Sequence, residues 1–178
     1  MGIHNTRYGA HYWQAGETSI YESAKNDLYR YTAFIGTQVL PVIERGGSRM
    51  MVSEDRGSVK WTASTSSFAS EHLAVHIAGY QCGYKKTSLG ERVNLPYVNG
   101  CATRQLFAPE RIGDPTFQQL TMPPFTSEQV HHIHPTARVV YVLEGKGWSI
   151  VGQTGDDEET ELVAGMTCIL EPMCPHHF

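Results

Sequence analysis

The sequence predicts a mainly β protein, an antiparallel, jelly-roll-like β-barrel with an N-terminal extension that contains a helix. Two observations support this prediction. After residue 100, short apolar segments are separated at short intervals by Pro, Gly and acidic residues, which is typical of an antiparallel barrel or sandwich. Before residue 100, one stretch has helical periodicity and the rest is irregular. We therefore expect residues 1–100 to form an extension packed on a barrel core of residues 101–178.

The predicted helix covers residues 18–40. Ser19 and Glu22 have the spacing of a capping box. Apolar residues follow at intervals close to one helical turn, and Pro41 would end the helix. The residues with this spacing are Ile20, Leu28, Tyr31, Phe34 and Ile35.

Strands are predicted on both sides of residue 100. In the first half they are short and irregular, at residues 50–52, 59–61 and 73–77. In the second half they are regular, at residues 102–107, 116–122, 139–143, 148–151, 161–163 and 166–170. The acidic residues 156–159 follow Gly155, and we expect them to form a solvated hairpin turn.

Composition excludes several classes of protein. The 178 residues fit one domain, and 14 Lys+Arg against 18 Asp+Glu give a net charge of -4, which disfavours nucleic-acid binding. The longest apolar stretches, residues 39–43 and 139–143, are far shorter than the roughly 20 residues that cross a bilayer, and no secretory signal is visible. The four cysteines show no paired spacing, so the expected setting is reducing and cytoplasmic.

Histidines gather near the end of the chain. Five of the nine lie between residues 131 and 177, in the segments His131-His132-Ile133-His134 and His176-His177. On an extended strand, residues i and i+2 point to the same face, so His132 and His134 can converge on one metal ion. A third histidine from the second segment would complete one face of the ion and leave positions for a substrate.

These segments resemble the two motifs of the cupin superfamily. His132-Ile133-His134-Pro135, followed by a strand that ends in Glu144-Gly145-Lys146-Gly147, is similar to the first motif. Gly165, Glu171-Pro172-Met173 and His176 match the second motif in spacing, although Glu171 and Met173 replace its Pro and Gly. The resemblance implies a cupin-type antiparallel β-barrel with a metal held by His132, His134 and His176.

The chain departs from the family pattern at Arg138. Metal-binding cupins with a glutamate ligand place it four residues after the second histidine, and here that residue is Arg138. A shell of three neutral histidines favours an anionic substrate, and it resembles the shells of thiol dioxygenases and of gentisate- and salicylate-type ring-cleaving dioxygenases. The resemblance implies one divalent ion, Fe(II) ahead of Zn, Ni or Mn.

Three site questions stay open at this level. Arg138 either enters the cavity and clamps a substrate carboxylate, or leans out to the barrel mouth and pairs with an acidic residue. His176 is preferred as the third ligand, and His177 replaces it if the second motif shifts by one residue. Tyr141 lies on the opposite strand parity and is expected in a core or interface, and Glu144 is expected to be exposed.

The leading functional hypothesis is a mononuclear non-haem iron(II) dioxygenase that acts on a small carboxylate-bearing aromatic or thiol. One alternative is a metal-dependent isomerase, epimerase or lyase on a sugar or keto acid, and another is a non-catalytic sensing module. By analogy with cupins, we expect a homodimer. Because the sequence ends at Phe178, just after the second motif, either the N-terminal half fills the remaining barrel positions or the chain is a truncated form.

Overall fold

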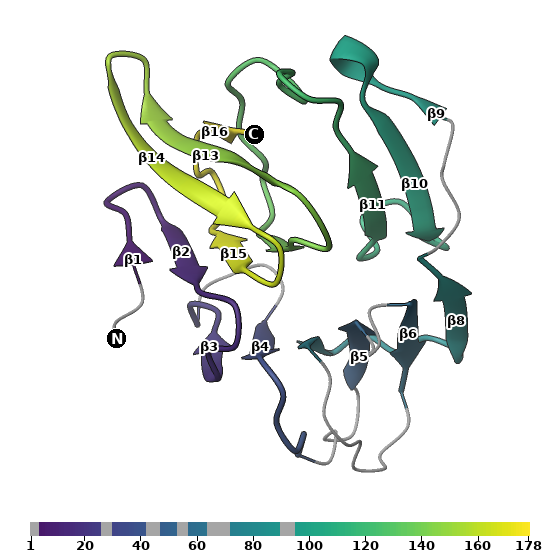
Figure 1. Cartoon of the computed structure of the whole chain (residues 1–178). Coiled ribbons are helices and arrows are strands. Elements are labelled where there is room, and N and C mark those ends of the chain that lie inside the picture. The colour runs from purple at the N-terminus through teal and green to yellow at the C-terminus, as the bar shows by residue number, and fades with distance from the viewer. Residues whose placement is uncertain (1–3, 26–29, 42–46, 53–56, 64–71, 90–94) are drawn as a thin grey trace.

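The structure is a computed structural model that describes residues 4–25, 30–41, 47–52, 57–63, 72–89 and 95–178. Within these ranges the chain is almost entirely antiparallel β-structure, arranged in four sheets (Figure 1). The helical content of the same ranges is the single 3-10 turn η1, Val98–Gly100. The mainly β, antiparallel prediction is confirmed.

A central sheet joins the two ends of the chain. Its strand order is β1 (His4–Asn5), β2 (Ala10–Trp13), β15 (Thr167–Leu170) and β12 (Arg138–Tyr141). The register between β2 and β15 pairs Ala10 with Leu170 and Trp13 with Thr167. The N-terminal strands therefore extend a sheet whose other members lie more than a hundred residues later.

Two smaller sheets carry the hairpins of the second half. The outer sheet has the order β14 (Asp156–Val163), β13 (Lys146–Gln153) and β16 (His176–His177). The other has the order β11 (Phe117–Thr121), β10 (Ala102–Phe107) and β9 (Leu95–Pro96). In Figure 1 the two long hairpins, β13–β14 and β10–β11, lie at the same end of the molecule. The six strands predicted after residue 100 are thus all present, with ends shifted by a few residues.

The first half builds a sheet of six strands, with the order β3-β4-β7-β5-β6-β8. The apolar pieces predicted to be irregular strands are its regular inner members. The bounds are β3 Ser19–Glu22, β4 Tyr31–Ile35, β5 Gly47–Val52, β6 Ser58–Thr62, β7 Leu73–Ala78 and β8 Lys85–Ser88.

The predicted helix over residues 18–40 is wrong. Ser19 and Glu22, the supposed capping box, lie in β3 opposite Ile35 and Thr32 of β4. The segment is rich in Thr, Ile, Tyr and Phe, which favour strands, and pairing of β4 with β7 decides the conformation over the described residues. The turn-like apolar spacing was coincidental: Ile20 is exposed, whereas Tyr31 and Ile35 are buried.

The acidic hairpin turn is also misplaced in the sequence-based prediction. Asp156 already belongs to β14, where it pairs with Gln153, so the turn is formed by Thr154 and Gly155. Gly155 has a φ of 84°, which an L side chain rarely adopts. The acidic side chains lie mostly exposed along β14, and Asp156 forms an ion pair with Arg7.

The central sheet has an apolar core on each face. Alternate residues of β15 point in opposite directions, so Ile169 packs with the six-stranded sheet while Cys168 and Leu170 pack towards the outer sheet. On β12, Val139 and Tyr141 face the first core and Val140 faces the second. Arg138 shares the parity of Val140, so it lies on the side of the outer sheet.

The strand pairings of the described ranges leave four separate sheets, and none of them closes on itself as a barrel would. In the same ranges, the structure holds no helix of the length and hydropathy needed to span a membrane. The antiparallel strands of the predicted cupin-type barrel are therefore present, but the described strands do not close into a barrel.

Candidate metal centre

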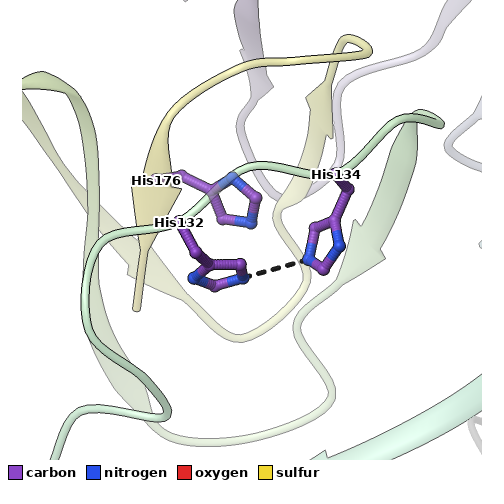
Figure 2. A group of neighbouring side chains, drawn as sticks. All are labelled: His132, His134 and His176. Atoms are coloured by element: carbon purple, nitrogen blue, oxygen red, sulfur yellow. Dashed lines mark hydrogen bonds between the residues drawn. The ribbon is translucent and has the colours of Figure 1, made fainter.

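Three histidines from two segments converge beside the central sheet. His132 and His134 lie in the segment before β12, and His176 lies in β16 (Figure 2). One ring nitrogen from each lies within 4.8 Å of the others. The Nε2 atoms of His132 and His134 are 3.0 Å apart. Two nitrogens that bind one ion at about 2.0–2.1 Å are separated by about 2.9–3.4 Å, so this spacing fits a shared ion.

Backbone pairing sets this convergence. His132 and His176 form an antiparallel bridge in which each backbone N–H donates to the other's carbonyl, at 3.0 and 2.9 Å. The loop before β16 is fixed to His134, because the Met173 N–H donates to the His134 carbonyl at 2.7 Å. Met173 reaches this position with a φ of 66°, in the left-handed region.

The same bridge explains where the neighbouring histidines point. Adjacent residues on paired strands face opposite sides, so His131 and His177 meet each other on the other face, with their Nδ1 atoms 2.9 Å apart. Of the two candidates for the third position, the structure brings His176 to the cluster and places His177 against His131.

Two of the three histidines present an accepting Nε2 to the cluster. The Nδ1–H of His132 donates to the Val130 carbonyl at 2.9 Å, and the Nδ1–H of His176 donates to the Cys174 carbonyl at 2.8 Å. A carbonyl on one ring nitrogen fixes the tautomer and leaves the other nitrogen as an acceptor, which is the usual arrangement of metal-binding histidines. The donor set therefore fits a divalent ion bound through Nε2.

His134 is held differently, by Arg138. Nη2 of Arg138 lies 2.9 Å from Nδ1 of His134. A guanidinium only donates, so Nδ1 of His134 accepts, and the ring proton resides on Nε2, from which it donates to His132. His134 can bind an ion through Nε2 only after this proton moves to Nδ1, and Nδ1–H has no acceptor in Arg138. Metal binding therefore requires Arg138 to leave His134.

Burial and neighbouring charge favour the neutral form of the histidines. Burial, followed by the charge of Arg138, lowers the pKa of His134 from its ordinary value of 6.5 to about 4. Burial also lowers the pKa of His176, partly offset by the hydrogen bond to the Cys174 carbonyl. Neutral imidazole is the form that binds metals, so both rings have the required charge at neutral pH, while the proton of His134 must still move from Nε2 to Nδ1.

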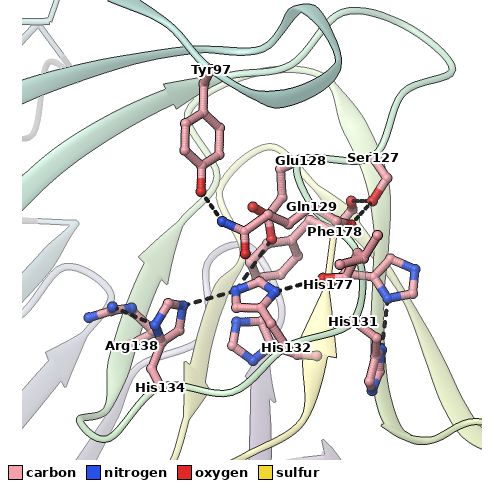
Figure 3. A network of polar contacts seen from close by, with 12 residues as sticks. Tyr97, Ser127, Glu128, Gln129, His131, His132, His134, Arg138, His177 and Phe178 are labelled. Atoms are coloured by element: carbon pink, nitrogen blue, oxygen red, sulfur yellow. Dashed lines mark hydrogen bonds and ion pairs between the residues drawn. The ribbon is translucent and has the colours of Figure 1, made fainter.

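Sequence reasoning missed two residues next to the cluster. The carboxylate of Glu128 lies 3.9 Å from Nε2 of His132, and the Glu128 side chain is only 8% exposed (Figure 3). The other is Tyr97, whose hydroxyl accepts a hydrogen bond from the side-chain amide of Gln129. Neither residue belongs to a motif, and a buried glutamate four residues before the first histidine gives no signal in a single sequence.

The remaining predicted residues lie at the edge of the site or away from it. Tyr141 lies at the far end of β12, stacked on His72 with ring centroids 5.8 Å apart, and Glu144 is exposed. Tyr141 therefore faces a core, as its strand parity predicts, and Glu144 is exposed, as expected. Cys174, two residues before His176, packs in the core on the outer-sheet side, where burial raises its pKa to about 11.

A cavity of about 350 Å³ lies away from the histidines. It opens where β12 ends, and its lining includes Glu17, Gly36, His72 and Tyr141. None of the three clustered histidines lines it. The candidate metal centre is therefore separate from this cavity.

Comparison with known protein families supports the cupin resemblance in the second half of the chain. Residues 118–178 match the family model of the cupin domain. That segment contains β11 to β16, all three clustered histidines and Arg138. Over these residues, the predicted cupin resemblance is confirmed, whereas the dioxygenase resemblance stays a prediction.

Comparisons of the whole chain with individual proteins add little to the family match. No curated protein matches it. Among solved structures, the chain is similar to a Cupin 2 conserved barrel domain protein from Leptotrichia buccalis, with 14% sequence identity and a TM-score of 0.47. The similarity covers 93% of this chain and 84% of that one.

Proposed function

We propose that this protein is a metal-dependent cupin enzyme, specifically a mononuclear non-haem iron(II) dioxygenase that acts on a small anionic substrate. The observation that carries the proposal is the group of His132, His134 and His176 with Arg138 in contact with it. Three neutral ligands leave the charge of a divalent ion uncompensated, which favours an anion as the next partner.

A divalent ion in this site would supply Lewis acidity and, as iron(II), redox chemistry. The protein's part is to hold and orient it. The Val130 and Cys174 carbonyls fix the rings of His132 and His176, so little ordering of these two side chains is needed on binding.

Arg138 supplies the recognition of the substrate in this proposal. Its guanidinium is half-buried, and its contacts include His134 and, at 3.5 Å, the hydroxyl of Thr136. Once the ion displaces it from His134, its donors are free to bind a substrate carboxylate in a bidentate pair. A carboxylate-bearing aromatic or a carboxylate-bearing thiol would meet both the ion and Arg138.

The test is metal content and oxygen uptake on protein purified without chelators or a His tag. We expect close to one equivalent of iron, lost in the His132→Ala/His134→Ala variant, and oxygen uptake with catechols, gentisate-like acids or thiols. Replacement of Arg138 by Ala should raise the substrate concentration required and should not lower metal content.

Two results would redirect the proposal. Activity retained with zinc or nickel without oxygen would assign the site to an isomerase, epimerase or lyase. No metal in either protein would overturn the catalytic proposal.

A further inference from the structure

A buried carboxylate lies next to the histidine cluster, on a segment outside both cupin motifs. Glu128 lies in the turn that follows β11, and the whole residue is only 6% exposed. Its backbone N–H donates to the Phe178 carbonyl at 3.1 Å. The backbone of Glu128 is therefore held by Phe178, the residue that follows β16.

A carboxylate at this depth calls for a cationic partner. Removing an ionised carboxylate from water costs several kcal/mol unless a charge or hydrogen bonds compensate it. In the described part of the chain, the ion-pair contact of Glu128 is with His132, whose Nδ1–H already donates to the Val130 carbonyl. A divalent ion at the cluster would supply the missing positive charge.

The geometry permits Glu128 to share that ion. Oε1 of Glu128 lies 3.9 Å from Nε2 of His132, the same atom that faces His134 (Figure 3). Two ligands that each lie about 2.1 Å from one ion are at most about 4.2 Å apart. The His132–Glu128 spacing lies inside this limit. The Glu128 carboxylate lies outside the group of ligand atoms that are all within 4.8 Å of one another, so it must turn towards His134 and His176 to share the ion.

We propose that Glu128 is the carboxylate ligand of the metal centre and replaces the glutamate that the cupin motif places at position 138. The inference rests on the metal centre proposed above and adds a fourth protein ligand to it. The carboxylate offsets one of the two charges of the ion and leaves the other for the anionic substrate. Arg138 and Glu128 then lie at different members of the cluster, the cation at His134 and the anion at His132. The site thereby separates two tasks: Glu128 binds the ion and Arg138 binds the anionic substrate.

This assignment changes which ions the site prefers. Carboxylate oxygen suits Mn(II) and other hard ions, whereas imidazole suits zinc and copper. Removing the Glu128 charge should therefore weaken Mn(II) binding more than Zn(II) binding.

The test measures Mn(II) and Zn(II) affinities by isothermal titration calorimetry on four proteins: the original chain, Glu128→Gln, Glu171→Gln and His132→Ala/His134→Ala. Glutamine keeps the shape of Glu128 and removes its charge. Glu171 is the control, because it is another carboxylate paired with a histidine, His11 at 2.7 Å, but it is half-buried and lies outside the cluster. Thermal unfolding of the metal-free proteins reports folding, and Glu128→Asp replaces Glu128→Gln if the latter does not fold.

We expect Glu128→Gln to bind Mn(II) on the order of 100-fold more weakly, with a smaller loss for Zn(II), while Glu171→Gln binds both ions as the original chain does. Equal Mn(II) affinity in Glu128→Gln and the original chain would overturn the role of Glu128 and leave the three-histidine centre intact. Absence of binding in the original chain would overturn the metal centre itself, and Glu128 as its ligand with it.

Discussion

Arg138 donates a hydrogen bond to Nδ1 of His134 across 2.9 Å, at the position where a metal-binding cupin would place a glutamate ligand. The bond orders the protons of its neighbours: Arg138 donates to His134, His134 to His132, and His132 to the Val130 carbonyl. Because the guanidinium cannot accept a proton and the carbonyl cannot donate one, the direction of this chain is determined at both ends. The metal and Arg138 therefore compete for His134.

Replacement of Arg138 by Gln should tighten metal binding. A hydrogen bond that involves a charged group contributes about 1.5–3 kcal/mol, and this bond must break before His134 coordinates an ion. Gln can also accept from Nδ1–H, so we expect at least a roughly tenfold lower Kd for Zn(II), measured by chelator competition. Lys146→Gln is the control, because it removes an equal charge at an exposed position, 4.0 Å from Glu161. Weaker binding in Arg138→Gln would show that Arg138 supports the cluster instead of competing with the ion.

A bound ion should stabilise the folded chain. The cluster depends on the backbone bridge between His132 and His176, which is absent once the chain unfolds, so the ion binds the folded state preferentially. At a free metal concentration of one hundred times the Kd, the free energy of unfolding should rise by about 2.7 kcal/mol. Scanning calorimetry with and without metal measures the shift in Tm. The double variant His132→Ala/His134→Ala should show no shift, and a shift of equal size there would place the ion elsewhere.

The metal-free protein should lose stability as the pH falls from about 6.5 towards 4. The pKa of His134 is lowered from 6.5 to about 4 in the folded state, so between these values the unfolded chain binds a proton that the folded chain does not. Stability therefore rises with pH in this window and is unaffected by His134 above it. We expect a plot of Tm against pH to be less steep for His134→Gln than for the original chain. Parallel plots would assign the acid sensitivity to other groups.

Gly36 should tolerate substitution less well than Gly16, although both have a positive φ, of 75° and 82°. A Cβ at Gly36 would lie 2.1 Å from the carbonyl oxygen of Glu17, whereas a Cβ at Gly16 would have nothing within 4 Å. Gly16→Ala should lower the free energy of unfolding by about 1–2 kcal/mol, because an L side chain strains the left-handed backbone conformation. Gly36→Ala adds a backbone clash, for a total of about 2–4 kcal/mol. Urea denaturation of both variants measures the difference, and equal costs would contradict the close approach of residues 17 and 36.

The strands after residue 100 were predictable from the sequence, since each is a short apolar stretch bounded by turn residues. Residues 102–107, for example, were predicted as a strand and form β10 with those ends. The failure at residues 18–40 has a physical cause: β3 pairs with β4, and β4 pairs with β7, some forty residues later. A local pattern carries no information about that distant partner.

The candidate metal centre was likewise predicted in part from the sequence, and the tertiary structure decided the rest. The sequence alone identified His132, His134 and His176 as candidates, because i and i+2 parity and motif spacing are local properties of the chain. The choice between His176 and His177 was decided by the bridge between His132 and His176, which aligns two segments more than forty residues apart.

What the sequence by itself determined is the antiparallel β class of the second half and the candidacy of His132 and His134, because both depend on alternation along one segment. Only the tertiary structure decided that Arg138 turns to His134 and that Glu128 is buried beside His132. Side-chain direction outside a regular strand and burial of a charged group depend on contacts between distant segments, and these form only when the sheets pack together.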